Sequence, residues 1–226
     1  MSVTPEEWTA IALSLKVALW ATGASLPAAI AVALLLARGR FRGRAVVDGL
    51  VHLPLVMPPV VTGYLLLLLF GRSGPLGALL ADWFGITVAF RWTGAALAAA
   101  VMAFPLMVRA IRLSIEAVDR RLEAAAGTLG AGPAAVFLTV TLPLILPGIL
   151  AGLIMGFAKA LGEFGATITF VSSIPGETQT IALSVYALLQ VPGGDAAALR
   201  LVAVSVAISM AALLASELLA RRMRHA

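Results

Sequence analysis

The sequence has no cysteine and only two histidines, His52 and His225. Without cysteine the chain cannot form disulfides, thiolate metal sites or a cysteine nucleophile, and two distant histidines do not make an imidazole cluster. Charged residues are also scarce, at 12% of the 226 residues, whereas soluble domains carry about 25%. These shortages argue against zinc or redox chemistry and against a soluble enzyme. We expect no metal site, no catalytic residue and no cofactor.

Apolar residues, by contrast, make up 61% of the chain, and its mean hydropathy is +1.03. A membrane-spanning helix needs about 20 mostly apolar residues. Five segments meet or approach that length: Val17–Ala37, Gly49–Gly71, Thr93–Val108, Pro143–Ala158 and Leu201–Ser216. The segment 166–194 is uncharged over long stretches but rich in glycine, proline and hydroxyl residues, so we expect a short external helix and loops there. The sequence predicts an all-α multi-pass membrane protein with about five transmembrane helices. We expect one membrane domain, 1–226, with its core at about 11–216.

The arginines predict the orientation of these helices. Most of them fall in the segments after the first and third spans and in the tail, namely Arg38, Arg40, Arg42, Arg44, Arg109, Arg112, Arg120, Arg121, Arg221, Arg222 and Arg224. Short cytoplasmic loops hold the excess of basic residues, so we expect the N-terminus outside and the C-terminus in the cytoplasm. The net charge of +5 is explained by this topology and does not indicate a nucleic-acid partner. Glu6 and Glu7 stand where a signal peptide would be basic, so the first span is expected to be retained.

The loop at about 120–142, on the predicted cytoplasmic side, has an unusual composition. Leu122–Ala126 favours a helix, Gly127, Gly130 and Gly132 interrupt it, and Pro133 can begin another helix. The pattern predicts a short helix, a sharp turn and a second helix that returns to the bilayer. Its small residues suit either docking into a groove of a partner or close packing of the hairpin on itself.

This loop resembles the cytoplasmic coupling loop of ABC importer permeases, whose pattern is Glu-Ala-Ala, three residues, Gly, nine residues, Ile, one residue, Leu-Pro. Gly130, Val140, Leu142 and Pro143 match in register, and the family's Ala-Ala pair falls on Ala125 and Ala126. The family's glutamate position falls on Ala124, and the acidic residue here is Glu123, one position earlier. The resemblance implies that this loop contacts an ATPase subunit through Glu123, Ala124, Ala125, Ala126, Gly130, Leu142 and Pro143.

Two further segments narrow the family. Residues 159–170 with 174–178, and residues 53–64, are similar to the corresponding regions of molybdate and sulfate permeases. The resemblance implies a type I ABC importer permease fold in the cytoplasmic (inner) membrane and an importer that moves molybdate, or tungstate, by alternating access. The short chain favours the molybdate branch, and a sulfate or other oxyanion permease is the alternative. The expected partners are cytoplasmic ATP-binding ABC subunits, an external oxyanion-binding protein, a second copy of the chain and membrane lipid.

The chain itself is not expected to be an enzyme. It lacks the Gly-x4-Gly-Lys-Ser/Thr pattern of ATP-binding loops, so ATP hydrolysis is expected on a separate chain. An intramembrane hydrolase is a remote alternative, because Ser73 lies in no Gly-x-Ser-x-Gly pattern and His52 is predicted at the opposite membrane face. A secondary transporter is equally remote, since neither an internal repeat nor intramembrane acidic residues for ion coupling are apparent.

Several residues are candidates for the translocation path or its gate: Pro58, Pro59, Thr62, Lys159, Glu163 and Thr167. Prolines inside a span remove backbone donors, so the second span is either broken beside a hydrated path or kinked for packing. Thr62 lines a polar route or bonds to its own backbone. Lys159 and Glu163 have the spacing of an ion pair on one helical face, which serves either a gate or the structure.

A last sequence feature concerns the fourth span. Gly148, Gly152 and Gly156 recur on one helical face, for which we expect packing within the subunit.

Overall fold

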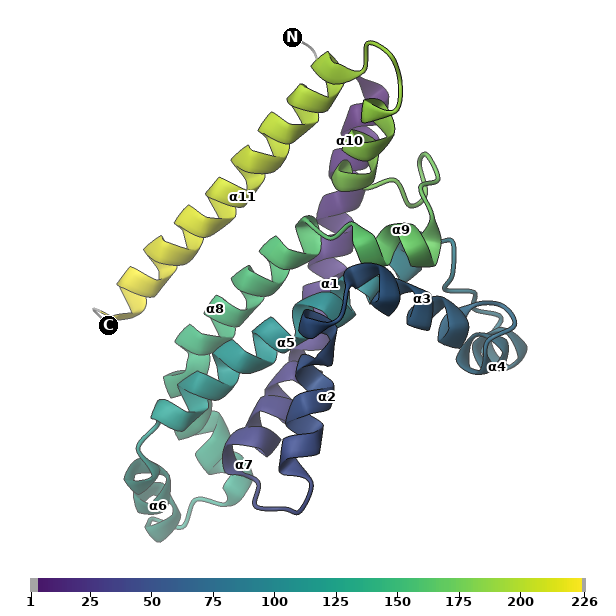
Figure 1. The fold of residues 1–226 in the computed structure, drawn as a ribbon. Helices are drawn as coiled ribbons and strands as arrows, with labels where there is room; N and C mark the ends of the chain where they lie inside the picture. The colour runs from purple at the N-terminus through teal and green to yellow at the C-terminus, as the bar shows by residue number, and fades with distance from the viewer. Residues whose placement is uncertain (1–3, 225–226) are drawn as a thin grey trace.

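The computed structural model describes residues 4–224, which are helical with no strand in that range. The three remaining residues at the start and two at the end of the predicted domain, His225 among them, lie outside the described part. The helices are α1 (Pro5–Arg38), α2 (Arg44–Val56), α3 (Pro59–Phe70), α4 (Pro75–Phe84), α5 (Trp92–Ala117), α6 (Arg120–Thr128), α7 (Pro133–Val136), the π-helix η1 (Phe137–Thr141), α8 (Leu142–Leu161), α9 (Gly165–Val171), α10 (Ile181–Leu189) and α11 (Asp195–Arg224) (Figure 1). The predicted all-α class is confirmed.

Four of the expected spans are single helical runs that are long and apolar enough to cross a membrane. They are α1, α5, the continuous run Pro133–Leu161 and the Asp195–Ala215 part of α11. The expected second span, Gly49–Gly71, is broken rather than kinked at its prolines, because α2 and α3 meet at an angle of 113°. The count of five therefore holds only if this bent pair is one span.

The bend has a local cause in the Pro58-Pro59 pair. Neither proline can donate a backbone hydrogen bond, and Pro59 excludes the helical conformation at Pro58, which has φ −54° and ψ 132°. The Met57 amide still donates to the Leu53 carbonyl, so α2 is complete up to the break. Pro54 lies within α2 and does not end it.

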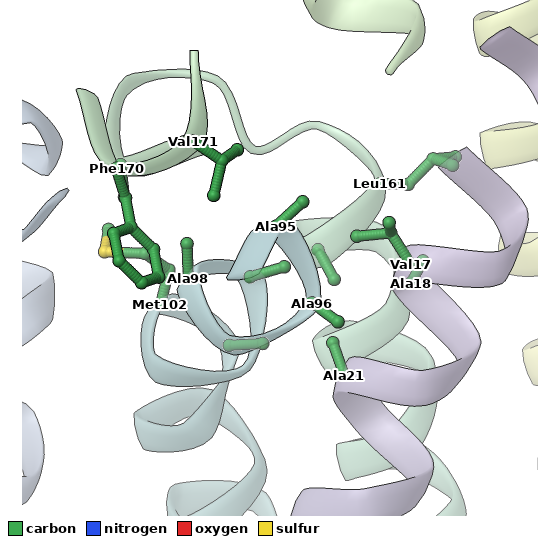
Figure 2. Packing of buried hydrophobic residues seen from close by; sticks show 14 of the residues in the cluster. Val17, Ala18, Ala21, Ala95, Ala96, Ala98, Met102, Leu161, Phe170 and Val171 are labelled. Atoms are coloured by element: carbon green, nitrogen blue, oxygen red, sulfur yellow. The ribbon is translucent and has the colours of Figure 1, made fainter. Parts of the chain in front are cut away.

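The centre of the molecule is formed by α1, α5 and α8, which pack along one another (Figure 1). Where α1 crosses α5, the buried side chains are mostly alanines, which allow close approach of the two backbones (Figure 2). They are Ala18 and Ala21 from α1 and Ala95, Ala98 and Ala99 from α5. Further along the same helices, larger side chains such as Leu36, Met107, Ile111 and Ile145 fill the core.

The glycine face of α8 packs within the subunit, as predicted. A methyl group on Gly156 would lie 2.7 Å from the Cγ atom of Met107, and one on Gly148 would overlap the Ser114 side chain. Both neighbours belong to α5. These glycines therefore set the distance between α5 and α8.

The helix ends gather at two opposite ends of the molecule. The α1–α2 turn and α6 lie at one end, and the start of α1, α10 and the α10–α11 connection lie at the other (Figure 1). At the second end Arg200 of α11 donates to the Glu7 carboxylate of α1 over 2.7 Å. The segment 166–194 contains most of α9 and all of α10, where the sequence analysis expected one short helix. Which end faces the cytoplasm stays a prediction from the arginine distribution.

Candidate functional site

The loop after α5 folds as a short helix, a turn and a second helix, as its glycine and proline pattern predicts. Asp119 begins α6 by accepting a hydrogen bond from the Arg121 amide over 2.9 Å. The helix ends at Thr128 with Leu129 as its cap, and Gly130 follows with φ +89°, a left-handed conformation that favours glycine. Pro133 then starts α7, which continues through η1 into α8.

This hairpin exposes its small residues. No residue of α6 is buried within the described chain, and Ala124, Ala125 and Gly130 are all exposed. Leu129, which the sequence analysis did not single out, is 88% exposed at the tip of the turn. Its signal in the sequence is weak, since it is only a leucine directly before a glycine. An exposed leucine among alanines and glycines is suited to a partner's groove.

The other predicted coupling residues, Leu142, Pro143 and Glu123, do not belong to the exposed surface of the hairpin. Leu142 and Pro143 are not at the tip, because they lie at the start of α8, directly after η1. Glu123 points back toward the membrane helices, and its Oε1 accepts from Arg38 over 3.0 Å and from the Thr141 hydroxyl over 2.8 Å. Arg38 and Thr141 were absent from the predicted site, since Arg38 is one of many arginines and Thr141 matches a variable position of the loop pattern.

The second candidate region is the crossing of α3 and α9, which lie side by side (Figure 1). Pro58 and Pro59 form the start of α3, and a methyl group on Gly165 of α9 would lie 2.7 Å from the Pro59 Cβ. Thr62 and Thr167 are both buried on these helices. The Thr62 hydroxyl has no hydrogen-bond partner in the described residues, so the alternative of a bond to its own backbone is not observed.

Lys159 and Glu163 form the predicted ion pair, with Nζ and Oε2 2.6 Å apart. The Glu163 side chain is only 1% exposed, and its other oxygen accepts from the Ala166 amide over 3.0 Å. The pair therefore anchors the first turn of α9 to the end of α8. Within residues 4–224 no three His, Asp or Glu side chains are grouped as metal ligands.

The closeness of α3 and α9 depends on Gly63. A methyl group there would lie 2.5 Å from the Ala166 carbonyl oxygen and 2.8 Å from the Ala166 Cα, which are backbone atoms that cannot rotate away. We expect Gly63→Val to separate the two helices and to cost about 1–3 kcal/mol of stability. Thermal unfolding of the purified protein in detergent measures this loss.

The matched control is Gly49→Val in α2, where a methyl group meets no atom within 4 Å. It introduces the same β-branched residue into a helix without the contact with α9. Equal stability of the two variants would contradict the importance of the α3–α9 contact.

Comparisons with known proteins agree with this architecture. Residues 25–225 match the family described as binding-protein-dependent transport system inner membrane component. The chain is 60% identical over 225 residues to the molybdenum transport system permease protein ModB of Escherichia coli strain K12, covering 100% of this chain and 98% of that protein. It is 56% identical over 218 residues to the protein of the same name from Haemophilus influenzae, covering 96% and 95%.

Among solved structures, the fold is similar to a bacterial ABC transporter involved in the import of the acidic polysaccharide alginate. The TM-score is 0.74 at 20% identity, and the match covers 97% of this chain and 80% of that one.

Proposed function

Because this chain belongs to the family of binding-protein-dependent transport system inner membrane components and is a molybdate ABC permease subunit of the inner membrane, we propose that its α6 hairpin couples a separate ATPase to the translocation path. The full-length identity of 60% to a molybdenum permease supports molybdate as the substrate, with tungstate as a close analogue. The permease supplies the path, and ATP is hydrolysed on the partner chain.

The observation that carries this proposal is the exposed hairpin of α6. It is short, it buries none of its own residues in the described chain, and it presents Leu129 and a left-handed glycine at its tip. The hairpin also lies at the same end of the molecule as the α1–α2 turn, where the arginines predict the cytoplasm (Figure 1). A protruding apolar turn in the cytoplasm fits a groove on an ATP-binding subunit.

The path is proposed to lie beside the α2–α3 break, between two copies of the chain. A dianion cannot enter lipid without a large desolvation cost, so its route needs polar, hydrated walls. The break at Pro58 and Pro59 frees backbone carbonyls, and both prolines are exposed in the single chain. Thr62 lies on α3 and Thr167 on α9, and the Lys159–Glu163 pair connects α8 to α9. Movement of α3 against α9 would then open and close the path.

The family description also supports an external partner, because its members depend on a binding protein. We propose that an oxyanion-binding protein docks at the end opposite α6 and delivers its ligand to the outward-open dimer. ATP binding brings the ATPases together and the α6 hairpins with them, and hydrolysis reverses the movement. The cycle is one of alternating access.

Reconstitution tests this function. The permease is placed in liposomes with its candidate ATPase and receptor, and ATP hydrolysis is measured with added molybdate, tungstate or sulfate. We expect molybdate and tungstate to stimulate hydrolysis and sulfate not to do so. Equal stimulation by sulfate would support the alternative of a general oxyanion permease, and failure of the ATPase to associate would refute the role of the α6 hairpin.

A further inference from the structure

The carboxylate of Glu123 connects three segments of the chain. It belongs to α6, and its Oε1 accepts from Arg38 at the end of α1 and from Thr141 at the end of η1, directly before α8. Within residues 4–224, every hydrogen bond that leaves an α6 side chain for another element is made by Glu123. The exposed hairpin is thus tied to the membrane helices chiefly by one side chain.

The surroundings of this contact make it stronger than an ordinary surface pair. Arg38 and Glu123 are each 24% exposed and Thr141 is buried. A charged acceptor shared by two donors at 2.8 and 3.0 Å gives charge-assisted hydrogen bonds of good length. The pair lines an open hollow of about 480 Å³ that is bordered by α1, α6, α7 and η1.

The partner segment η1 is itself unusual. It is a π-helix of five residues inserted between α7 and α8, and the Leu142 amide donates to the Phe137 carbonyl across its wide turn. Single π turns are rare and are concentrated at functional sites, where they redirect side chains or allow bending. Here the turn ends on Thr141, whose hydroxyl is directed to Glu123.

We infer that Glu123 is a positioning residue that transmits displacement of the α6 hairpin to α1 and α8 together. This inference rests on the proposed function, in which an ATPase moves α6. Since α1 and α8 both pack against α5 in the core, a pull on Glu123 acts on two of the three central helices. The π turn gives the start of α8 the freedom to follow. The exposed alanines and Leu129 bind the ATPase, and Glu123 passes the motion inward.

The test separates docking from transmission. Glu123→Gln keeps the size of the side chain and an acceptor for Thr141 but removes the charge that holds Arg38. In liposomes with ATPase and receptor, we expect the number of molybdate ions imported per ATP hydrolysed to fall about tenfold, as expected for loss of one charge-assisted hydrogen bond. The affinity for the ATPase is expected to remain within about twofold, because the exposed tip is unchanged.

Two further variants guard against a simple loss of structure. Glu116→Gln removes a carboxylate of α5 that pairs with Arg112 and Arg44 and not with Arg38 or Thr141, so it should keep the wild-type ratio. The exchange Arg38→Glu with Glu123→Arg restores an opposite-charge pair, and the Thr141 hydroxyl can then accept from the arginine. We expect this double variant to recover import per ATP, whereas Arg38→Glu alone does not.

Each result is decisive. A wild-type ratio in Glu123→Gln overturns the inference, and so does a loss of ATPase binding in that variant, since Glu123 would then belong to the docking surface. Failure of the charge exchange to restore the ratio also contradicts it. If the wild-type protein shows no molybdate-dependent hydrolysis at all, the proposed function fails before this question arises, so the two failures are distinguishable.

Discussion

Gly130→Trp is expected to abolish ATP-driven molybdate uptake while the protein still inserts into the membrane. The left-handed backbone at φ +89° costs any L side chain about 1–2 kcal/mol. A Cβ atom at this position meets no atom of the chain within 4 Å, and the neighbouring Leu129 is exposed, so we expect the indole to add to the surface of the turn. It would occupy the space that we propose for the groove of the ATPase. We expect at least a tenfold loss of uptake, measured in liposomes, together with loss of ATPase co-purification.

Gly43 offers a matched control for this substitution. It lies in the α1–α2 turn at the same end of the molecule, with φ +94° and open space around its Cα. Gly43→Trp therefore imposes a similar backbone strain and adds a similar exposed indole, but outside the proposed docking surface. We expect uptake by this variant to stay close to wild type. Normal transport by Gly130→Trp would contradict the coupling assignment, and equal losses in both variants would point to strain alone.

The helices were predictable from the sequence where apolar length was the only requirement. The span beginning near Val17 extends back to Pro5 in the structure, because Thr4 and Glu7 form a capping box and Lys16 is accommodated over the Trp92 ring at 3.7 Å. The shape of the second span was harder to predict, because its prolines indicate a break but not the angle of that break. The angle depends on the contact of α3 with α9. This contact is made by Gly63 of α3 and Gly165 of α9, which lie about a hundred residues apart in the sequence.

The site was predictable to the extent that it is local. The glycines and Pro133 specify the hairpin of α6 directly, and a spacing of four residues predicted the Lys159–Glu163 pair. The role of Glu123 was not accessible, because its partners Arg38 and Thr141 come from distant segments. The resemblance placed Glu123 beside the family's acidic position, and only the fold shows that its carboxylate faces inward. Residues that bind partners outside the chain can follow a motif, whereas residues that connect helices depend on tertiary packing.

The Lys159–Glu163 pair allows its two possible roles to be separated by experiment. Glu163→Leu leaves the Lys159 ammonium without its partner and the Ala166 amide without its acceptor. Leaving a buried amide without its acceptor costs about 1–3 kcal/mol, so we expect a fall in the thermal unfolding temperature and loss of uptake. Glu163→Gln is the milder control, because its amide oxygen can still accept from the Ala166 amide.

The double variant Lys159→Met with Glu163→Leu decides between structure and gate. Replacing a whole buried pair by apolar side chains is often neutral for stability, so the unfolding temperature should return toward wild type. If the pair serves only to hold α9 on α8, uptake returns with it. We expect uptake to stay low, because the proposed gate uses the charges of Lys159 and Glu163 and not only their hold on α9. Full recovery of molybdate uptake by the stable double variant would remove Lys159 and Glu163 from the gate.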